Sequence, residues 1–134
     1  MEKITNELTG IKTVAIAGHV RPDGDCVGSC MGLYLYLKEN HPELSVDVYL
    51  EQPGENFSYI RSFEEIKTVY PQGKVYDLFI TLDVSDKNRI GVAMEGYETA
   101  KKRICIDHHI SNRGLGDVNE IRPDASSTCE VLYT

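Results

Sequence analysis

Three apolar runs, each followed closely by polar residues, restrict what this chain can fold into. They cover 13–18 ("TVAIAG"), 76–85 ("YDLFITLDVS") and 103–109 ("RICIDHH"). The first run is continuous and rich in small and β-branched residues, which is typical of a strand buried on both faces. Helix-like patterns separate the runs, and strands that alternate with helices form a parallel sheet. We therefore expect an α/β fold with a mostly parallel sheet and helices on both of its faces.

The segments between and around these runs complete the alternation. Apolar residues at helical spacing predict a helix over 27–39, and "NHP" (40–42) ends it. We expect the last helix over 126–134, where Ser127 and Glu130 have the spacing of a capping box. The other expected elements are helices over 2–9, 57–66 and 91–102, a strand over 45–50 and a short edge strand over 117–121.

Size and charge exclude several classes of protein. A length of 134 residues suits one domain. A net charge of −7 argues against a broad basic face, so long duplex nucleic acid is not expected as a partner. No apolar segment approaches the length of a membrane span, the N-terminus lacks a signal-peptide pattern, and the four cysteines are scattered. We therefore expect a cytoplasmic protein with free thiols and no membrane partner.

Carboxylates and imidazoles gather after three of the expected strands. They are His19, Asp23 and Asp25 after the first, Asp83 and Asp86 after the second, and Asp107, His108 and His109 after the third. In an open α/β sheet, ligands bind beyond the carboxyl ends of the strands. Each group alone has an ordinary explanation as a turn or a helix cap, but three coincidences at three strand ends favour one shared site.

This mixture of side chains is suited to divalent cations. Carboxylates and imidazoles together favour Mn²⁺, with Mg²⁺, Co²⁺, Fe²⁺ or Zn²⁺ as substitutes. Four or more carboxylates in one cleft repel one another unless cations lie among them, so we expect two ions that share a bridging carboxylate. Two such ions lower the pKa of a shared water and hold a phosphoryl group. Hydrolysis of a phosphoester or phosphoanhydride is therefore the leading chemistry.

Four motifs resemble those of the DHH phosphoesterase superfamily and follow in the same order. They are "HVRPDGD" (19–25), "LDVSD" (82–86), "DHH" (107–109) and "ASSTCE" (125–130). The first and last are most similar to a bacterial branch with bifunctional oligoribonuclease and 3'-phosphoadenosine 5'-phosphate phosphatase activity. The resemblance implies a Rossmann-like DHH domain that degrades short RNA to 5'-mononucleotides. It also implies removal of the 3'-phosphate from 3'-phosphoadenosine 5'-phosphate.

The resemblance further implies five metal ligands for two Mn²⁺ ions, with Mg²⁺ or Co²⁺ as substitutes. His19 and Asp23 would hold one ion. Asp25 and His108 would hold the second, and Asp83 would bridge both. The bound substrate would be a short RNA or a phosphorylated nucleotide.

The same resemblance implies catalytic and substrate-binding side chains. His109 would face the scissile phosphate, and Asp107 would orient the neighbouring imidazoles. Ser127 and Thr128 would lie at a helix N-terminus that faces a phosphate, although both also suit a simple cap. Cys26 stands where the family usually has an alanine, either as a size match or as an oxidisable thiol.

By this resemblance, residues 1–134 are an incomplete N-terminal DHH catalytic domain. A further aspartate ligand and a DHHA1-like, substrate-binding C-terminal domain would lie beyond Thr134. Such a chain is expected to expose apolar surface and to be marginally stable or self-associating, and a homodimer is among the expected states.

Two other interpretations stay open at this point. One is a hydrolase of the same superfamily with a different substrate, such as a cyclic dinucleotide, pyrophosphate, polyphosphate or single-stranded DNA. The other is a fragment that binds metal without catalysis. Metal binding without turnover would distinguish the fragment from a working enzyme.

Overall fold

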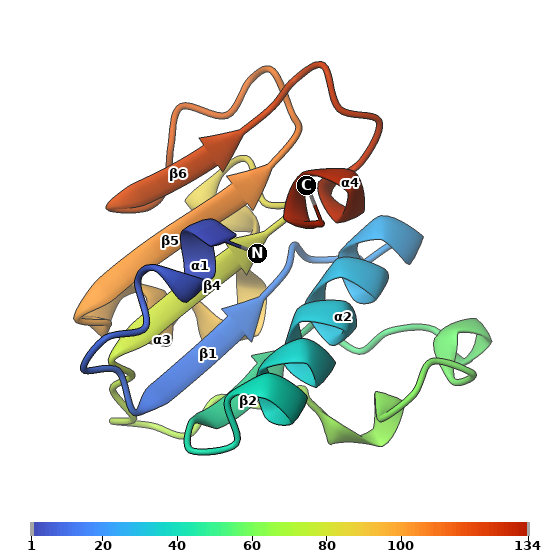
Figure 1. Cartoon of the computed structure of the whole chain (residues 1–134). Helices are drawn as coiled ribbons and strands as arrows, with labels where there is room; N and C mark the ends of the chain where they lie inside the picture. The colour runs from blue at the N-terminus through green and yellow to red at the C-terminus, as the bar shows by residue number, and fades with distance from the viewer. Residues whose placement is uncertain (1, 134) are drawn as a thin grey trace.

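The computed structural model describes residues 2–133 and contains one sheet of six parallel strands (Figure 1). The strands lie in the order β3-β2-β1-β4-β5-β6. Their bounds are β1 Thr13–Ala17, β2 Ser45–Tyr49, β3 Ile66–Lys67, β4 Leu78–Leu82, β5 Lys102–Asp107 and β6 Val118–Ile121. The chain starts in the middle of the sheet, builds one half outwards, and returns to build the other. The order therefore reverses between β1 and β4, where doubly wound folds bind their ligands.

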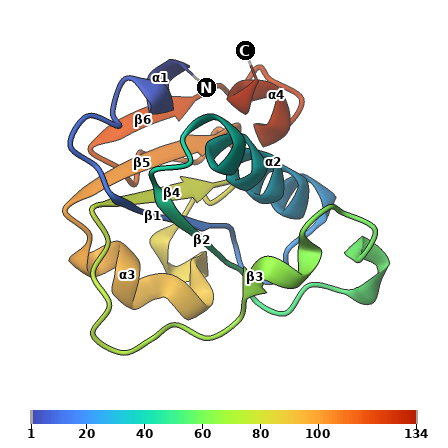
Figure 2. The same ribbon diagram turned by 60° about the horizontal axis from the view of Figure 1, so that its bottom comes forward.

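Helices cover both faces of the sheet, as expected (Figure 2). The helices α1 Glu2–Thr5, α2 Gly24–Asn40 and α4 Thr128–Leu132 pack on one face. The opposite face carries α3 Met94–Thr99, preceded by the short 3₁₀ helices η3 Lys87–Arg89 and η4 Gly91–Ala93. The α/β prediction with a parallel sheet is confirmed.

The central strands β1 and β4 are largely apolar because both of their sides are buried. In β1, Val14 and Ile16 pack with the α2 side, whereas Ala15 and Ala17 belong to the cluster on the α3 side. All five residues of β4 are buried as well. Alternate side chains of a strand point to opposite faces, so an alternating polar pattern would be incompatible with this position.

Four expected helices have different bounds in the structure. The helix expected over 2–9 spans Glu2–Thr5, and the one expected over 91–102 spans Met94–Thr99. The helix expected over 27–39 begins earlier, at Gly24, because the Asp23 carboxylate accepts a hydrogen bond from the Cys26 N–H (2.9 Å) and caps it. The helix expected over 126–134 spans Thr128–Leu132, and Thr134 lies outside the described residues. Ser127 caps this helix by accepting from the Glu130 N–H (3.1 Å).

The helix expected over 57–66 is wrong. This segment holds η1 Glu55–Phe57, η2 Phe63–Glu65 and the unexpected short strand β3. Ser62 adopts a left-handed backbone conformation (φ 64°), which interrupts a right-handed helix. Tyr59 is 81% exposed, so the apolar residues that suggested a buried helical face do not all turn inward.

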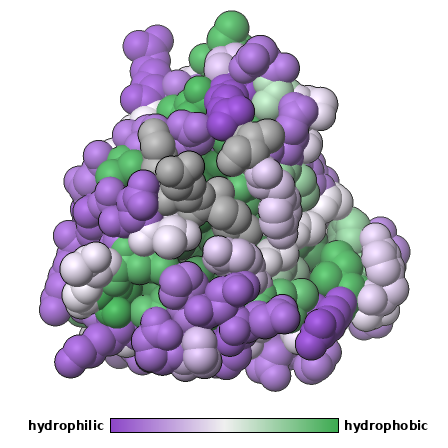
Figure 3. Space-filling model, in the orientation of Figure 1, coloured by the Kyte–Doolittle hydropathy of each residue, from purple (hydrophilic) through white to green (hydrophobic). Residues whose placement is uncertain are grey.

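The surface seen in Figure 3 is hydrophilic over most of its outline, with patches of hydrophobic residues showing among the polar ones. None of the helices in the part of the chain that is described has the length and apolar character needed to span a bilayer.

Three hydrogen bonds, which run in both directions, join the starts of β1 and β4. The Asp77 carboxylate accepts from the N–H groups of Lys12 (2.9 Å) and Thr13 (3.2 Å), and the Asp77 N–H donates to the Thr13 hydroxyl (2.9 Å). Lys101 Nζ lies 3.3 Å from the same carboxylate. The pKa of Asp77 lies below its usual value, mainly because of the hydrogen bond from the Lys12 N–H. The Thr13 N–H and the charge of Lys101 lower this pKa further, while desolvation opposes them.

We expect Asp77→Asn to lower the urea midpoint of unfolding at neutral pH and to have little effect in acid. The folded-state pKa is depressed, so the stability from ionised Asp77 is present above its unfolded pKa of about 3.9 and is lost as the pH falls through the folded value. Urea unfolding of both proteins from neutral pH to about pH 2 measures this. Asp124→Asn, the same change at an exposed position, serves as the control. A midpoint difference that persists undiminished in acid would contradict the expectation.

Candidate metal centre

The carboxyl ends of β1, β4 and β5 open into one cavity of about 530 Å³ at the point where the strand order reverses. It is lined by His19, Asp23, Asp25, Asp83, Ser85, Arg89, His108, His109, Ser126 and Ser127. Seven of these ten are site residues expected from the sequence. The remaining expected residues, Asp107 and Thr128, are fully buried and contact the carboxylates or imidazoles of the wall.

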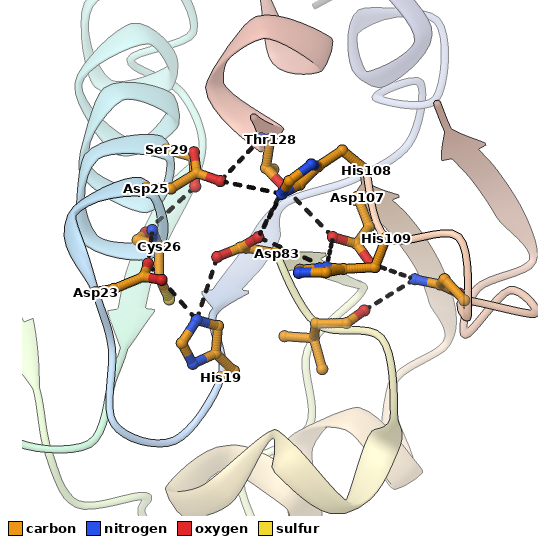
Figure 4. Close-up of polar contacts among 12 residues, drawn as sticks. His19, Asp23, Asp25, Cys26, Ser29, Asp83, Asp107, His108, His109 and Thr128 are labelled. Carbon is orange, nitrogen blue, oxygen red and sulfur yellow. Dashed lines mark hydrogen bonds and ion pairs between the residues drawn. The ribbon is translucent and has the colours of Figure 1, made fainter. Parts of the chain in front are cut away.

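Asp83 lies at the centre of the cluster (Figure 4). Its two carboxylate oxygens face different imidazoles, since Oδ2 is 3.2 Å from His19 Nε2 and Oδ1 is 3.7 Å from His108 Nε2. The side chain is only 3% exposed. The backbone of Asp83 is left-handed (φ 64°), a conformation that aspartate tolerates better than most residues and that is often retained at functional sites.

His19 shows that this part of the cavity attracts positive charge. The pKa of His19 is raised to about 9, mainly by the hydrogen bond to Asp83, which outweighs the opposing effect of burial. Its Nδ1 lies 2.6 Å from the carbonyl oxygen of Val20, and this contact orients the ring so that Nε2 faces Asp83. Asp23 approaches the same Nε2 at 3.7 Å and is 64% exposed.

Asp25 is held by the start of α4. Its carboxylate accepts hydrogen bonds from the N–H groups of Thr128 (2.9 Å) and Cys129 (3.0 Å). Burial alone would raise the pKa of Asp25, but these N–H groups hold it below its usual value. His108 Nε2 lies 3.7 Å from the same carboxylate, so Asp25 and His108 lie on one side of Asp83, while His19 and Asp23 lie on the other.

Asp107 is fully buried below the histidines. It lies 2.7 Å from His109 Nδ1, and it accepts a second hydrogen bond from Asn112 Nδ2 (2.9 Å). Asn112 also donates to the carbonyl of Val84 (3.0 Å), so it links the loops that follow β4 and β5. Asn112 could not be singled out from the sequence, because a single asparagine after "DHH" is equally typical of a turn.

Thr128 occupies a different position from the one expected for a substrate-binding residue. It is fully buried and does not line the cavity. Its hydroxyl donates to Asp83 Oδ1 (3.0 Å) and lies 3.4 Å from Asp107 Oδ1. Ser126 and Ser127 line the wall instead. Thr128 therefore orients carboxylates, while the serines before it face the cavity.

The donor set fits divalent cations. One ligand atom from each of Asp83, Asp107, His108 and His109 lies within 4.8 Å of the others, and so do atoms of His19, Cys26 and Asp83. Carboxylate oxygens and imidazole nitrogens are ligands of Mn²⁺, Co²⁺ and Zn²⁺. A buried carboxylate between two imidazoles is also a costly arrangement unless positive charge lies nearby.

Arg89 also lines the cavity, although its place three positions after Asp86 would equally suit a local ion pair at the start of a helix. Its carbonyl accepts a hydrogen bond from the Val20 N–H (2.7 Å), which ties η3 to the loop after β1. Among the described residues that form the cavity wall, Arg89 is the one arginine or lysine.

Comparison with known proteins agrees with this arrangement. The model of the DHH family, N-terminal domain, matches residues 13–134, which include all four motifs. The chain belongs to the DHH family. This confirms the resemblance inferred from the motifs.

Characterised relatives fall within the branch that the first and last motifs indicated. The bifunctional oligoribonuclease and PAP phosphatase NrnA of Bacillus subtilis is 31% identical over 121 residues, which are 90% of this chain and 37% of that protein. The protein of the same name from Thermus thermophilus is 29% identical over 120 residues, 89% of this chain and 35% of that protein. This chain thus spans little more than a third of the length of these two relatives.

A solved structure shares the fold. An exopolyphosphatase-related protein from Bacteroides fragilis superposes with a TM-score of 0.84 and 23% identity, over 98% of this chain and 41% of that chain. This similarity supports the parallel α/β architecture of the DHH domain.

Proposed function

We propose that this DHH domain is the metal-dependent catalytic part of a phosphoesterase that acts on short RNA and on 3'-phosphoadenosine 5'-phosphate. In the proposed reaction, a short oligoribonucleotide releases a 5'-mononucleotide, and the bisphosphorylated adenosine loses its 3'-phosphate. The observation that carries the proposal is the convergence of three strand ends on Asp83, whose two oxygens face separate imidazoles. The names of the NrnA relatives support the choice of substrates.

The ligand set supports two cation positions that share Asp83. His19 and Asp23 would hold one cation, and Asp25 and His108 would hold the other. Bound divalent cations, Mn²⁺ in our proposal, would neutralise the carboxylates and withdraw electrons from the scissile phosphate. Asp23 caps α2, and hydrogen bonds hold His19, Asp25 and Asp83 in place from outside the cavity, so these four ligands are positioned before substrate arrives.

Side chains on the cavity wall are suited to hold the substrate phosphate. The Arg89 guanidinium presents several N–H donors in a plane that matches phosphate oxygens. Ser126 and Ser127 add hydroxyl groups on the wall beside α4. His109 is fixed through Nδ1 by Asp107, which leaves Nε2 as the ring nitrogen to contact a phosphate or to give a proton to the departing oxygen.

The experiment that tests the proposal is a substrate panel with this chain and Mn²⁺. A 5'-labelled RNA dinucleotide, 3'-phosphoadenosine 5'-phosphate and tripolyphosphate are each incubated with and without a chelator. We expect chelator-sensitive hydrolysis of the first two. Hydrolysis of tripolyphosphate alone would contradict the proposed substrates while leaving the metal centre in place. No hydrolysis of any substrate, together with undetectable Mn²⁺ binding, would contradict both.

We expect Arg89→Gln to raise the KM for the dinucleotide by about tenfold or more while metal affinity stays unchanged. Loss of a charged hydrogen bond to phosphate has an effect of this size. Among the described residues, no hydrogen bond or ion pair joins the Arg89 side chain to the metal-binding carboxylates, which also line the cavity. Steady-state kinetics and Mn²⁺ titration measure the two quantities. Arg61→Gln, outside the cavity, is the control. An unchanged KM would show that the phosphate is held by other groups.

A further inference from the structure

A cysteine thiol lies among the ligands on the His19 side of the centre. Ligand atoms of His19, Cys26 and Asp83 all lie within 4.8 Å of one another. Cys26 is fully buried, and Figure 4 shows it in the first turn of α2 beside Asp23. Its position follows from the helix cap, since the Cys26 N–H donates to the Asp23 carboxylate (2.9 Å) and brings the two residues onto one face of the helix.

The structure leaves room for this thiol at Gly18, directly after β1. A Cβ atom at position 18 would come within 2.1 Å of Cys26 Sγ and within 3.2 Å of Cys30 Sγ. A side chain at this position is therefore incompatible with the thiol where it stands. The absence of a side chain at Gly18 lets the Cys26 sulfur pack against the backbone that leads from β1 to His19.

A second thiol lies beside the first, one turn further along α2. The Sγ atoms of Cys26 and Cys30 both lie next to Gly18, and Cys30 is fully buried. The Cys30 S–H is therefore placed to donate to Cys26 if Cys26 becomes a thiolate. Outer hydrogen bonds of this kind stabilise and orient the sulfur ligands of metal sites.

We propose that Cys26 is a ligand of the cation held by His19 and Asp83, so that this position prefers a thiophilic ion such as Zn²⁺ or Co²⁺ to Mn²⁺. The inference rests on the metal centre of the proposed function and specifies the ligands and the ion of one of its two positions. Coordination replaces the S–H bond of Cys26 with a sulfur–metal bond, and the proton leaves to solvent. Thiolate, imidazole and carboxylate together are typical ligands of Zn²⁺, whereas Mn²⁺ favours oxygen donors.

The other cation position has different ligands. Asp25 and His108, with the second oxygen of Asp83, offer oxygen and nitrogen donors. The nearby Cys129 thiol is directed at the backbone carbonyl of Asp25 (3.8 Å). The two positions are therefore expected to prefer different metal ions, with the harder ion on the Asp25 side.

Titration of the whole chain with Co²⁺ tests the proposal without an activity assay. A thiolate bound to Co²⁺ gives a charge-transfer absorption band in the near ultraviolet, and equilibrium dialysis counts bound Co²⁺ independently. We expect the band in the unmodified chain and its loss in Cys26→Ala. We expect Cys30→Ala and Cys129→Ala, the matched controls, to keep it. Competition should show the preference for Zn²⁺ over Mn²⁺ falling by about tenfold or more in Cys26→Ala.

Three outcomes would overturn the inference, and they are distinguishable. Bound Co²⁺ without the band would exclude sulfur coordination and leave the proposed metal centre intact. A band that persists in Cys26→Ala but disappears in Cys129→Ala would assign the sulfur ligand to the Asp25 side. The absence of any bound Co²⁺ or Mn²⁺ in dialysis would overturn the metal centre itself.

Discussion

Replacing Asp83 with asparagine is expected to weaken Mn²⁺ binding by at least about 100-fold and to abolish metal-dependent hydrolysis. Within residues 2–133, Asp83 is the carboxylate whose oxygens face both His19 and His108, so its loss affects both cation positions. Asparagine retains an oxygen that can accept from the Thr128 hydroxyl, so the fold should persist. Isothermal titration with Mn²⁺ and dinucleotide hydrolysis measure the two effects.

Asp86→Asn is the matched control for this change. Asp86 follows the same strand but caps η3, where its carboxylate accepts from the Asn88 N–H (2.9 Å), and it does not line the cavity. We expect near-normal Mn²⁺ affinity in this variant. Equal losses in Asp83→Asn and Asp86→Asn would mean that net charge, rather than coordination by Asp83, governs metal binding.

Thr128→Val is expected to lower Mn²⁺ affinity by about 10- to 100-fold without any change in shape at the site. The substitution removes the hydroxyl that donates to Asp83 Oδ1 (3.0 Å) and lies 3.4 Å from Asp107. Buried Asp83 then lacks a donor that orients it, which should also cost about 1–3 kcal/mol of folding stability. Mn²⁺ titration and urea unfolding of the metal-free chain measure the two quantities.

The control for Thr128 is the same substitution at an exposed threonine. The Thr99 hydroxyl donates to the Glu95 carbonyl at the end of α3, away from the cavity. Thr99→Val should leave Mn²⁺ affinity unchanged. If Thr128→Val also bound Mn²⁺ normally, the hydroxyl would have no part in orienting the carboxylates, and its burial would be a matter of packing alone.

The central strands could be located from the sequence because their signal is local. β1 and β4 are buried on both faces, and this burial requires a largely apolar run whatever the rest of the chain does. The carboxyl ends of parallel strands meet at one edge, so the gathering of Asp83 and the "DHH" segment also followed from the order of the elements. The segment 57–66 had no comparably strong local signal, and its left-handed Ser62 could not be foreseen from the apolar spacing.

By itself, the sequence determined the α/β class, the parallel sheet and the set of side chains that meet at its edge. Only the tertiary structure decided how those side chains face one another. Thr128 and Asp25 are separated by 103 positions, yet the N–H of one binds the carboxylate of the other. Similarly, whether Arg89 pairs with nearby Asp86 or lines the cavity depends on how η3 packs against the loop after β1. Local patterns report burial and backbone preference, whereas such distances depend on the packing of elements that are far apart in the chain.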